Sequence, residues 1–389
     1  MRLPTEAELS REQREVCSAA PEGTSLVIGP PGSGKTVVAI YRKGTLQRMG
    51  ENVTAVAWNN VLAQYGEMDR TFESWLNAWW RDTTRQHFPK SIQNGWRIPD
   101  YKQALAEALG PKRAAIAQNG NWGHLILDEA QDFSQDAHKL LSIARTFSED
   151  GANEPSSLLI LADENQRITD SNATLDEIRR AHSLIKDDVY YLTKNYRNTR
   201  EIALVAQQFY VGTASGLPEI QKKEGDKPKL LTSCPIDEAV KRIVNHARTH
   251  EDHEIGVLVY RENTRKKFFN KLKHRLAETD IHVQTYFSDT RNGGGASLAK
   301  RLQFDQGGTV TVLCFASSKG VEFDSVFLPE LQQMPASDEG GEVTKMQLYV
   351  MASRARTHLS FMMDDASRGS PIWRLMPGDN LLNELFDVD

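Results

Sequence analysis

The segment Gly29–Thr36 has the residue types and spacing of a phosphate-binding loop. Its sequence, GPPGSGKT, fits the pattern G-x4-G-K-S/T and lies between an apolar run at 26–28 and a helical pattern at 36–48. Glycines let backbone N–H groups approach phosphates, and a following helix directs the positive end of its dipole toward them. The pattern predicts an ATP site formed by Gly32, Ser33 and Gly34, with Lys35 on the β- and γ-phosphates and Thr36 on Mg²⁺. A glycine-rich turn without nucleotide is the alternative.

Two carboxylates, Asp128 and Glu129, directly follow the wholly apolar run Leu125–Leu127. A buried strand there would place both at its carboxyl end, beside the phosphate loop. ATP hydrolysis needs one carboxylate to hold Mg²⁺ and another to polarise water. We therefore assign Asp128 to the metal and Glu129 to the water. A solvated turn is the alternative, and the apolar run argues against it.

A further polar cluster, residues 162–166, follows the apolar run Leu158–Leu161. Its last residue, Gln166, is a candidate for sensing the γ-phosphate and orienting the attacking water. The same position also suits a simple strand-end cap, and the sequence leaves both interpretations open.

The elements that must hold these groups alternate between apolar runs and helical patterns. Short runs at 26–28, 53–57, 125–127 and 158–161 have the character of strands buried on both faces, which indicates a parallel sheet covered by helices. A second alternation begins near Val189. We therefore predict an α/β fold with two domains, residues 1–188 and 189–389.

Two segments interrupt this alternation. Residues 65–121 are predicted to form a small, largely helical insertion, in which the spacing of Trp75 and Trp79 favours core positions. Residues 289–308 contain three consecutive glycines and are predicted to be loop-like, too short to bury a core.

Length and composition limit the remaining possibilities. A chain of 389 residues suits two or three domains, and 39% hydrophobic content is sufficient for real cores. The net charge of −5 argues against a wholly basic nucleic-acid-binding surface but permits a local basic groove. The three cysteines are far apart, so no Cys/His cluster indicates zinc, and the odd count fits a reducing compartment. Without an apolar run long enough to span a bilayer, we expect a cytoplasmic protein and no membrane partner.

Taken in order, the motifs resemble those of the UvrD/Rep family of superfamily 1 helicases. Asp128–Asp132 (DEAQD) resembles that family's D-E-x-Q-D motif. Further matching segments follow the same order along the chain: Gln13 in an upstream motif, 195–198 (NYRN), 318–323 (SKGVEF) and 348–356 (LYVMASRAR). The resemblance covers most of the chain, from Gln13 to about Phe361.

The resemblance implies two RecA-like domains with the ATP site in the cleft between them. It implies that Gln13 reads adenine, that Tyr196 stacks on adenine, and that Gly320 and Glu322 hold the nucleoside. It also implies that Arg197 reaches the γ-phosphate and that Arg354 is a second arginine finger. Fingers of this kind neutralise charge that develops on the transferred phosphoryl group.

The DNA-facing motifs depart from the family pattern. Trp58 and Asn60 lie where the family has T-F-T-N, and Trp58 keeps an aromatic ring for base stacking, although a core tryptophan is the alternative. Thr71 begins a segment that resembles T-F-H-S, but Glu73 replaces its histidine. Residues 167–170 offer no aromatic side chain where the family stacks bases. The ATP-binding motifs are therefore complete, whereas the DNA-binding motifs are partly changed.

Two function hypotheses follow from this resemblance. The first is ATP hydrolysis coupled to 3′-to-5′ translocation on single-stranded nucleic acid, most plausibly DNA, or to unwinding of a duplex. The alternative is a DNA-sensing regulatory subunit that controls a partner such as a nuclease, with little unwinding of its own. Compact members of this kind occur beside a nuclease in bacterial anti-phage systems such as Gabija. A small-molecule kinase is a third, weaker possibility.

Overall fold

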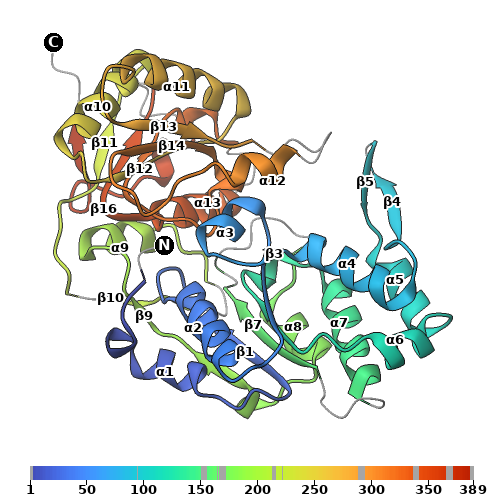
Figure 1. Cartoon of the computed structure of the whole chain (residues 1–389). Helices are drawn as coiled ribbons and strands as arrows, with labels where there is room; N and C mark the ends of the chain where they lie inside the picture. The colour runs from blue at the N-terminus through green and yellow to red at the C-terminus, as the bar shows by residue number, and fades with distance from the viewer. Residues whose placement is uncertain are drawn as a thin grey trace. The chain divides into compact units, whose positions relative to one another are not determined.

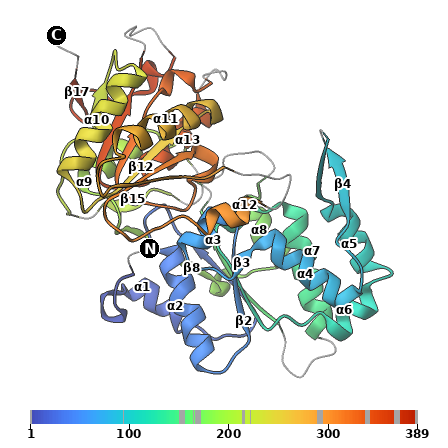
Figure 2. The same cartoon turned by 45° about the horizontal axis from the view of Figure 1, so that its top comes forward.

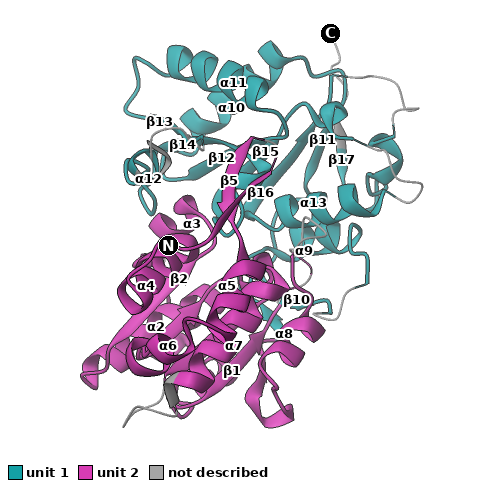
Figure 3. Ribbon diagram, turned by 90° about the vertical axis from the view of Figure 1, so that its right-hand side faces the viewer, with its two compact units in different colours: residues 1–2, 30–33, 193–389 teal, residues 3–29, 34–192 magenta. Residues whose placement is uncertain are grey.

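The chain divides into two compact units. The computed structural model describes residues 3–93, 95–149, 156–163, 165, 172–212, 216–220, 222–287, 294–335, 341–364 and 371–385. The N-terminal unit comprises residues 3–29 and 34–192, and the C-terminal unit comprises residues 30–33 and 193–389 (Figure 3). Residues 30–33, inside the predicted phosphate loop, thus group with the C-terminal unit.

A six-stranded parallel sheet forms the centre of the N-terminal unit, with the strand order β3-β2-β6-β7-β1-β8. Its strands are β1 (Thr24–Ile28), β2 (Val53–Ala57), β3 (Arg70–Thr71), β6 (His124–Leu127), β7 (Ser157–Ala162) and β8 (Val189–Tyr191). Several strands that follow one another in the sequence are not neighbours in the sheet. The chain between them must cross over, and helices form these connections.

Helices cover both faces of this sheet. The helices are α1 (Arg11–Cys17), α2 (Lys35–Arg48), α3 (Asn60–Tyr65), α4 (Phe72–Thr84), α5 (Tyr101–Leu109), α6 (Arg113–Asn119), α7 (Gln135–Glu149) and α8 (Leu175–Ala181). Leu26 and Ile28 of β1 join a core shared with α4 to α8. Val27, also buried, points to the other face because side chains alternate along a strand. Figure 2 shows α1 and α2 on the opposite side of the sheet from α4 and α7.

The predicted insertion is helical except for one hairpin. It contains α4, α5 and α6, and an antiparallel hairpin of β4 (Lys90–Gln93) and β5 (Trp96–Pro99) that extends away from α4 and α5 (Figure 1). Trp75 and Trp79 are buried and contact Trp122, which comes from just before β6. The predicted core positions of both tryptophans are therefore confirmed.

The C-terminal unit is built on a seven-stranded parallel sheet in the order β13-β14-β12-β15-β16-β11-β17. Its strands are β11 (Lys229–Leu231), β12 (Glu254–Val259), β13 (His282–Thr285), β14 (Thr309–Cys314), β15 (Phe323–Leu328), β16 (Ala355–Met362) and β17 (Asn383–Leu385). A separate two-stranded sheet pairs β9 (Lys194–Asn195) with β10 (Glu219–Ile220). Every residue of β12 is buried, as expected for an inner strand covered on both faces.

The helices of this unit are α9 (Arg200–Gln207), α10 (Ile236–Thr249), α11 (Glu262–Arg275), α12 (Gly294–Ala299) and α13 (Glu342–Ala352). Apolar residues of α10 and α11 share one core with β12 and β14. Figure 1 shows these two helices on one face of the sheet and α9 and α13 on the other.

The predicted α/β class, with two parallel sheets flanked by helices, is confirmed. Two details differ from the sequence prediction. β8 pairs with β1 and is the last strand of the first sheet, whereas we placed the start of the second domain at residue 189. The segment predicted to be loop-like from 289 to 308 contains the short helix α12. Among the described residues, no helix combines the length and apolar character needed to cross a membrane.

Candidate nucleotide site

The phosphate loop joins the end of β1, at Ile28, to the start of α2, at Lys35. Gly34 is the N-cap of α2 and has a φ of +87°, a conformation that side chains rarely adopt. A Cβ atom on Gly34 would also overlap Nε2 of Gln13. Glycine is thus required at this position both by the backbone and by the neighbouring side chain.

Lys35 holds its ammonium group at the base of this loop. Its Nζ donates a hydrogen bond to the carbonyl oxygen of Gly29 at 2.6 Å and lies 3.6 Å from Oδ2 of Asp163. Lys35 is buried although it is charged, which requires compensating acceptors of this kind. The structure therefore places one cation between the first residue of the loop and the carboxylate at the end of β7.

Gln13 is positioned by a capping box at the start of α1. The backbone N–H of Ser10 donates to Oε1 of Gln13 at 2.9 Å, and Oγ of Ser10 accepts from the N–H of Gln13 at 3.2 Å. With Oε1 engaged, the amide Nε2 is the atom beside Gly34. The predicted adenine-reading glutamine is thus brought next to the phosphate loop.

Thr36 and Asp128 are in direct contact. Oγ1 of Thr36 donates to Oδ2 of Asp128 at 2.7 Å, and the N–H of Glu129 donates to Oδ1 at 3.0 Å. Burial, and then the charge of Glu129, raises the pKa of Asp128 to about 7. A divalent cation beside Thr36 and Asp128 would favour the ionised carboxylate, so these two oxygen donors suit Mg²⁺.

Glu129 adopts the left-handed backbone conformation, with a φ of +53°. A non-glycine residue in this region costs about 1–3 kcal/mol and needs support from its surroundings. The support comes from Gln131, whose Nε2 donates to Oε2 of Glu129 at 2.5 Å and whose Oε1 accepts from the N–H of Asp163 at 2.9 Å. Gln131 thereby links the proposed water-activating carboxylate to the end of β7.

Three residues that contact predicted site residues were not assigned a role from the sequence. Gln131 orients Glu129, Asp163 lies beside Lys35, and Arg356 contacts Glu322. All three lie inside segments that the sequence analysis singled out, so the motif positions were the available signal. Gln166, predicted to sense the γ-phosphate, lies outside the described residues.

Tyr196 and Arg197 of the C-terminal unit flank the glycine at the loop tip. The N–H of Tyr196 donates to the carbonyl oxygen of Gly32 at 2.9 Å, and a Cβ atom on Gly32 would crowd the Cβ of Arg197 at 3.1 Å. Ser33, also in this unit, is buried. Tyr196 is 42% exposed, and its role in stacking on adenine stays a prediction.

Glu322 is held between two arginines of the same unit. It pairs with Nε of Arg197 and with NH2 of Arg356, the latter at 3.0 Å. Burial alone raises the pKa of Glu322, but the two guanidinium groups more than offset this and hold it well below its usual range. Glu322 therefore stays ionised and fixes the direction of Arg197, whose NH1 also donates to the carbonyl oxygen of Ser353 at 3.2 Å.

Gly320 belongs to the same motif as Glu322, and Arg354 belongs to the next motif along the chain. Arg354 is buried, and its guanidinium donates to the carbonyl oxygens of Val350 at 3.1 Å and Val321 at 3.4 Å. Gly320 has a φ of +84°, which accounts for glycine at the turn before Glu322. Arg354 thus braces the turn at residues 320–322, and its role as an arginine finger stays a prediction.

The candidate DNA-contacting residues follow strands of the first sheet. Trp58 comes directly after β2 and is 45% exposed, so it is not a core tryptophan. Asn60 is the first residue of α3, and Oγ1 of Thr71 caps α4 by accepting from the N–H of Ser74 at 3.3 Å. Thr71 thus has a local structural role whether or not it also contacts DNA.

Comparison with known proteins agrees with this geometry. Residues 13–172 match a family model described as an AAA domain, a range that begins at Gln13 and includes the phosphate loop and the Asp128–Asp132 motif. The chain contains an AAA-type P-loop ATPase domain. No curated protein matches the chain.

Many solved structures are similar to part of this chain. One of them is described as the C-terminal domain of a possible DNA helicase from Lactobacillus plantarum WCFS1, with 19% sequence identity and a TM-score of 0.33. The match covers 49% of this chain and 98% of that domain. The assignment of an ATPase domain therefore rests on the family match to residues 13–172 and on the contacts described above.

Within the ATPase domain, the raised pKa of Asp128 predicts a stability effect that depends on pH. The unfolded carboxyl loses its proton near pH 4 and the folded one only near pH 7, so folding stability falls as pH rises between these values. In Asp128→Asn this loss of folding stability is absent, because the asparagine side chain is never charged. We expect the variant to be about 2–4 kcal/mol more stable than wild type at pH 8. The difference should shrink toward pH 4.

Denaturant unfolding at pH 8 and pH 5, without nucleotide or divalent cations, measures this difference. Asp187→Asn, at an exposed site, is the matched control and should show little change at either pH. Equal stability of wild type and Asp128→Asn at pH 8 would contradict the burial argument. The variant should hydrolyse ATP at least about 100-fold more slowly than wild type if Asp128 is the Mg²⁺ ligand that the sequence predicts.

Gln131 provides a test of how Glu129 is positioned in the ATPase domain. Gln131→Ala removes the contact that holds the carboxylate, so we expect kcat to fall about 10- to 100-fold, part of what a positioned base contributes. KM for ATP should change little because Gln131 touches no predicted nucleotide-binding group. Gln135→Ala, on the next helix, is the control. If kcat of Gln131→Ala matched that of this control, Gln131 would be only a structural residue.

Proposed function

We propose that this chain is an ATP-driven motor that translocates on single-stranded nucleic acid, in the first instance DNA. In this proposal Lys35, Thr36 and Asp128 organise MgATP, while Glu129 and Gln166 activate and orient water. Gln13, Tyr196, Gly320 and Glu322 hold the nucleoside, and Arg197 and Arg354 neutralise charge on the γ-phosphate. Movement would run 3′ to 5′.

The supporting observation is a direct structural link between the hydrolytic carboxylates and an exposed tryptophan. The N–H of Asp128 donates to the carbonyl oxygen of Val56 at 2.9 Å, and Val56 is two residues before Trp58. The strands β2 and β6 that carry these groups are neighbours, so their carboxyl ends meet at one edge of the sheet. The backbone of Asp128 is therefore hydrogen-bonded directly to β2, the strand that ends just before Trp58.

Phe133 supplies a second link. It ends the turn at Ala130–Asp132. The centroids of its ring and of the Trp58 ring are 5.7 Å apart, at an interplanar angle of 46°. Phe133 also stacks on Phe72, with ring centroids 4.1 Å apart, and Phe72 directly follows Thr71. Both candidate DNA-contacting segments thus pack on the one aromatic ring that follows the catalytic motif.

This arrangement favours a motor over a small-molecule kinase. An exposed indole at the edge of an ATP-hydrolysing sheet offers a stacking surface that any base can use, without sequence preference. A small-molecule acceptor would instead need an enclosed pocket with a few placed polar groups. Coupling through Val56 and Phe133 would let the state of the nucleotide alter the grip on a base.

Steady-state ATP hydrolysis with and without single-stranded DNA tests the proposal. We expect DNA to stimulate hydrolysis by the wild type, and Lys35→Ala to lose about 100-fold or more of the activity in both conditions. Hydrolysis that is indifferent to DNA would contradict the autonomous motor. It would favour the alternative of a regulatory subunit whose ATP-dependent change is directed to a protein partner.

The stacking role of Trp58 predicts a selective loss of DNA affinity. Base–aromatic stacking contributes about 1–3 kcal/mol, so Trp58→Ala should weaken binding of single-stranded DNA roughly 5- to 100-fold. Trp58→Phe should restore most of the affinity because it keeps a ring. Trp96→Ala is the matched control, since Trp96 is 51% exposed on the hairpin strand β5. Fluorescence anisotropy at fixed salt measures all four proteins, and equal affinities for both alanine variants would remove Trp58 from the DNA site.

A further inference from the structure

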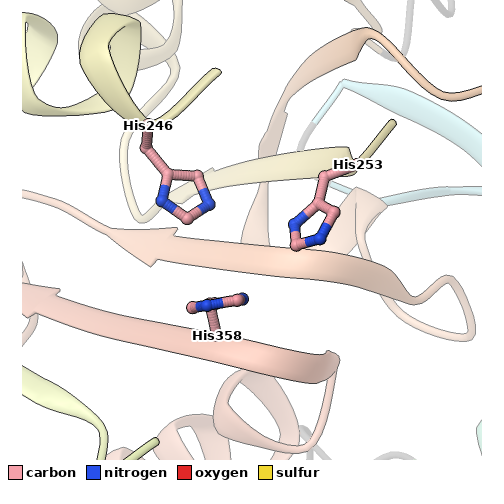
Figure 4. Close-up of side chains that lie close together, drawn as sticks. All are labelled: His246, His253 and His358. Carbon is pink, nitrogen blue, oxygen red and sulfur yellow. The ribbon is translucent and has the colours of Figure 1, made fainter. Parts of the chain in front are cut away.

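Four histidines gather beside the seven-stranded sheet, from segments that are distant in the sequence. His246 belongs to α10, His250 caps the end of that helix, His253 precedes β12, and His358 belongs to β16. The ring centroids of every pair lie between 4.0 and 5.9 Å apart. One ring nitrogen each of His246, His253 and His358 lies within 4.8 Å of the others, and Figure 4 shows these three side chains close together.

A buried hydroxyl orients two of these rings. Oγ of Ser325 lies 2.8 Å from Nε2 of His246 and 2.9 Å from Nδ1 of His253. A hydroxyl oxygen has two lone pairs, so it can accept an N–H from both neutral rings, which leaves the lone pair of each ring on its other nitrogen. In metal sites the second ring nitrogen of a histidine ligand commonly has such a fixed partner, which sets the ring's orientation.

The cluster favours uncharged imidazoles. Burial, followed by the other histidines, lowers the pKa of His246 to about 3. Burial is also the largest cause that lowers the pKa of His253 and His358. Neutral rings keep a lone pair at one nitrogen, and that lone pair is the donor that a metal ion needs.

A cavity of about 360 Å³ adjoins the cluster, lined in part by His246, His250 and His358. It provides a route to the rings from outside. Oδ2 of Asp226, at the cavity wall, lies 3.8 Å from Nε2 of His358, so a carboxylate is close to the ring nitrogens. Lys229 also lines the cavity, and its positive charge disfavours a cation there. The positive charge of the nearby Arg242 is paired with Glu238, with Nε of Arg242 2.8 Å from Oε1 of Glu238.

We infer that His246, His253 and His358 form a binding site for a divalent transition-metal ion, with Zn²⁺ as the reference ion. Imidazole donors suit zinc, copper and nickel, whereas Mg²⁺ and Ca²⁺ select oxygen. Zinc–nitrogen bonds of about 2.0–2.1 Å place tetrahedral ligands roughly 3.4 Å apart, so the rings must approach by about an ångström. Either Asp226 or a water molecule would supply the fourth ligand. This site is independent of the proposed motor function.

Bound metal would join three separate parts of the C-terminal unit: the end of α10, the turn before β12, and β16. Because the ion binds the folded arrangement and not the unfolded chain, it would stabilise this unit. The thiols of Cys17 and Cys314 are weak competitors, since burial raises their pKa to about 11 and about 12.

Titration of the full-length chain with Zn²⁺ against a chromophoric chelator tests the site. The protein is first treated with EDTA and exchanged into buffer without nucleotide or Mg²⁺. We expect one tightly bound equivalent per chain in wild type and in the control His274→Ala/His282→Ala, which removes two exposed histidines of the same unit. His253→Ala/His358→Ala should bind at least 10-fold more weakly, and Zn²⁺ should raise the Tm of only the first two proteins.

Two further variants test whether a loss of Zn²⁺ binding comes from misfolding or from a purely structural role of the cluster. His253→Gln, checked by circular dichroism, should lose affinity while it keeps the fold. Ser325→Ala leaves all three ligands in place and should weaken Zn²⁺ binding about 10-fold through loss of ring orientation. Absence of saturable binding to wild type, or equal affinity in wild type and the cluster variant, would overturn the assignment.

Discussion

The burial of Asp128 at the carboxyl end of β6 is the constraint on which the ATP site depends. A carboxylate removed from water is costly, and the hydrogen bonds from Thr36 and the N–H of Glu129 offset only part of that cost. Thr36 can reach Asp128 only because the phosphate loop turns tightly enough to start α2 beside β6. The positive φ of Gly34 makes that turn, and the neighbouring side chain of Gln13 leaves no room for a larger residue. One buried carboxyl group therefore determines the positions of a loop, a helix and two strand ends.

The same constraint explains the strained backbone at Glu129. If Asp128 points into the site toward Thr36, the next residue must turn sharply for its own carboxylate to remain nearby. The left-handed conformation of Glu129 achieves this, and Gln131 supports it with one hydrogen bond to the Glu129 carboxylate and another to the N–H of Asp163. The turn then places Phe133 between Trp58 and Phe72. In this way the turn that carries Asp128 and Glu129 also positions the aromatic residues at the edge of the sheet.

The sequence predicted those parts of the fold that local patterns encode. The bounds of β2, Val53–Ala57, agree with the structure because five small or β-branched residues lie between clear polar boundaries. β8 was predicted as a strand but assigned to the second domain, because its pairing with β1 is a long-range contact without a local signature. Gln131 was visible in its motif, yet its bridge to the N–H of Asp163 depends on the folded position of β7. The helix α12 was missed since its glycines have low helix propensity, and tertiary context overrides that preference.

The histidine cluster shows why a metal site can escape a search for sequence motifs. Three of its members lie within eight residues, from His246 to His253, but the charged residues Glu251 and Asp252 among them suggest an ordinary exposed turn. His358 is far away in the chain and joins them only because β16 and β12 both flank β15 in the sheet. Ser325 belongs to β15 itself, where it pairs in register with His358 and its hydroxyl contacts His246 and His253. Parallel-sheet topology brings the donors together here, just as it brings Asp128 to the phosphate loop. The two sites differ in donor chemistry, since oxygen surrounds one and imidazole nitrogen the other, so Mg²⁺ with nucleotide and a transition metal would not compete for the same place.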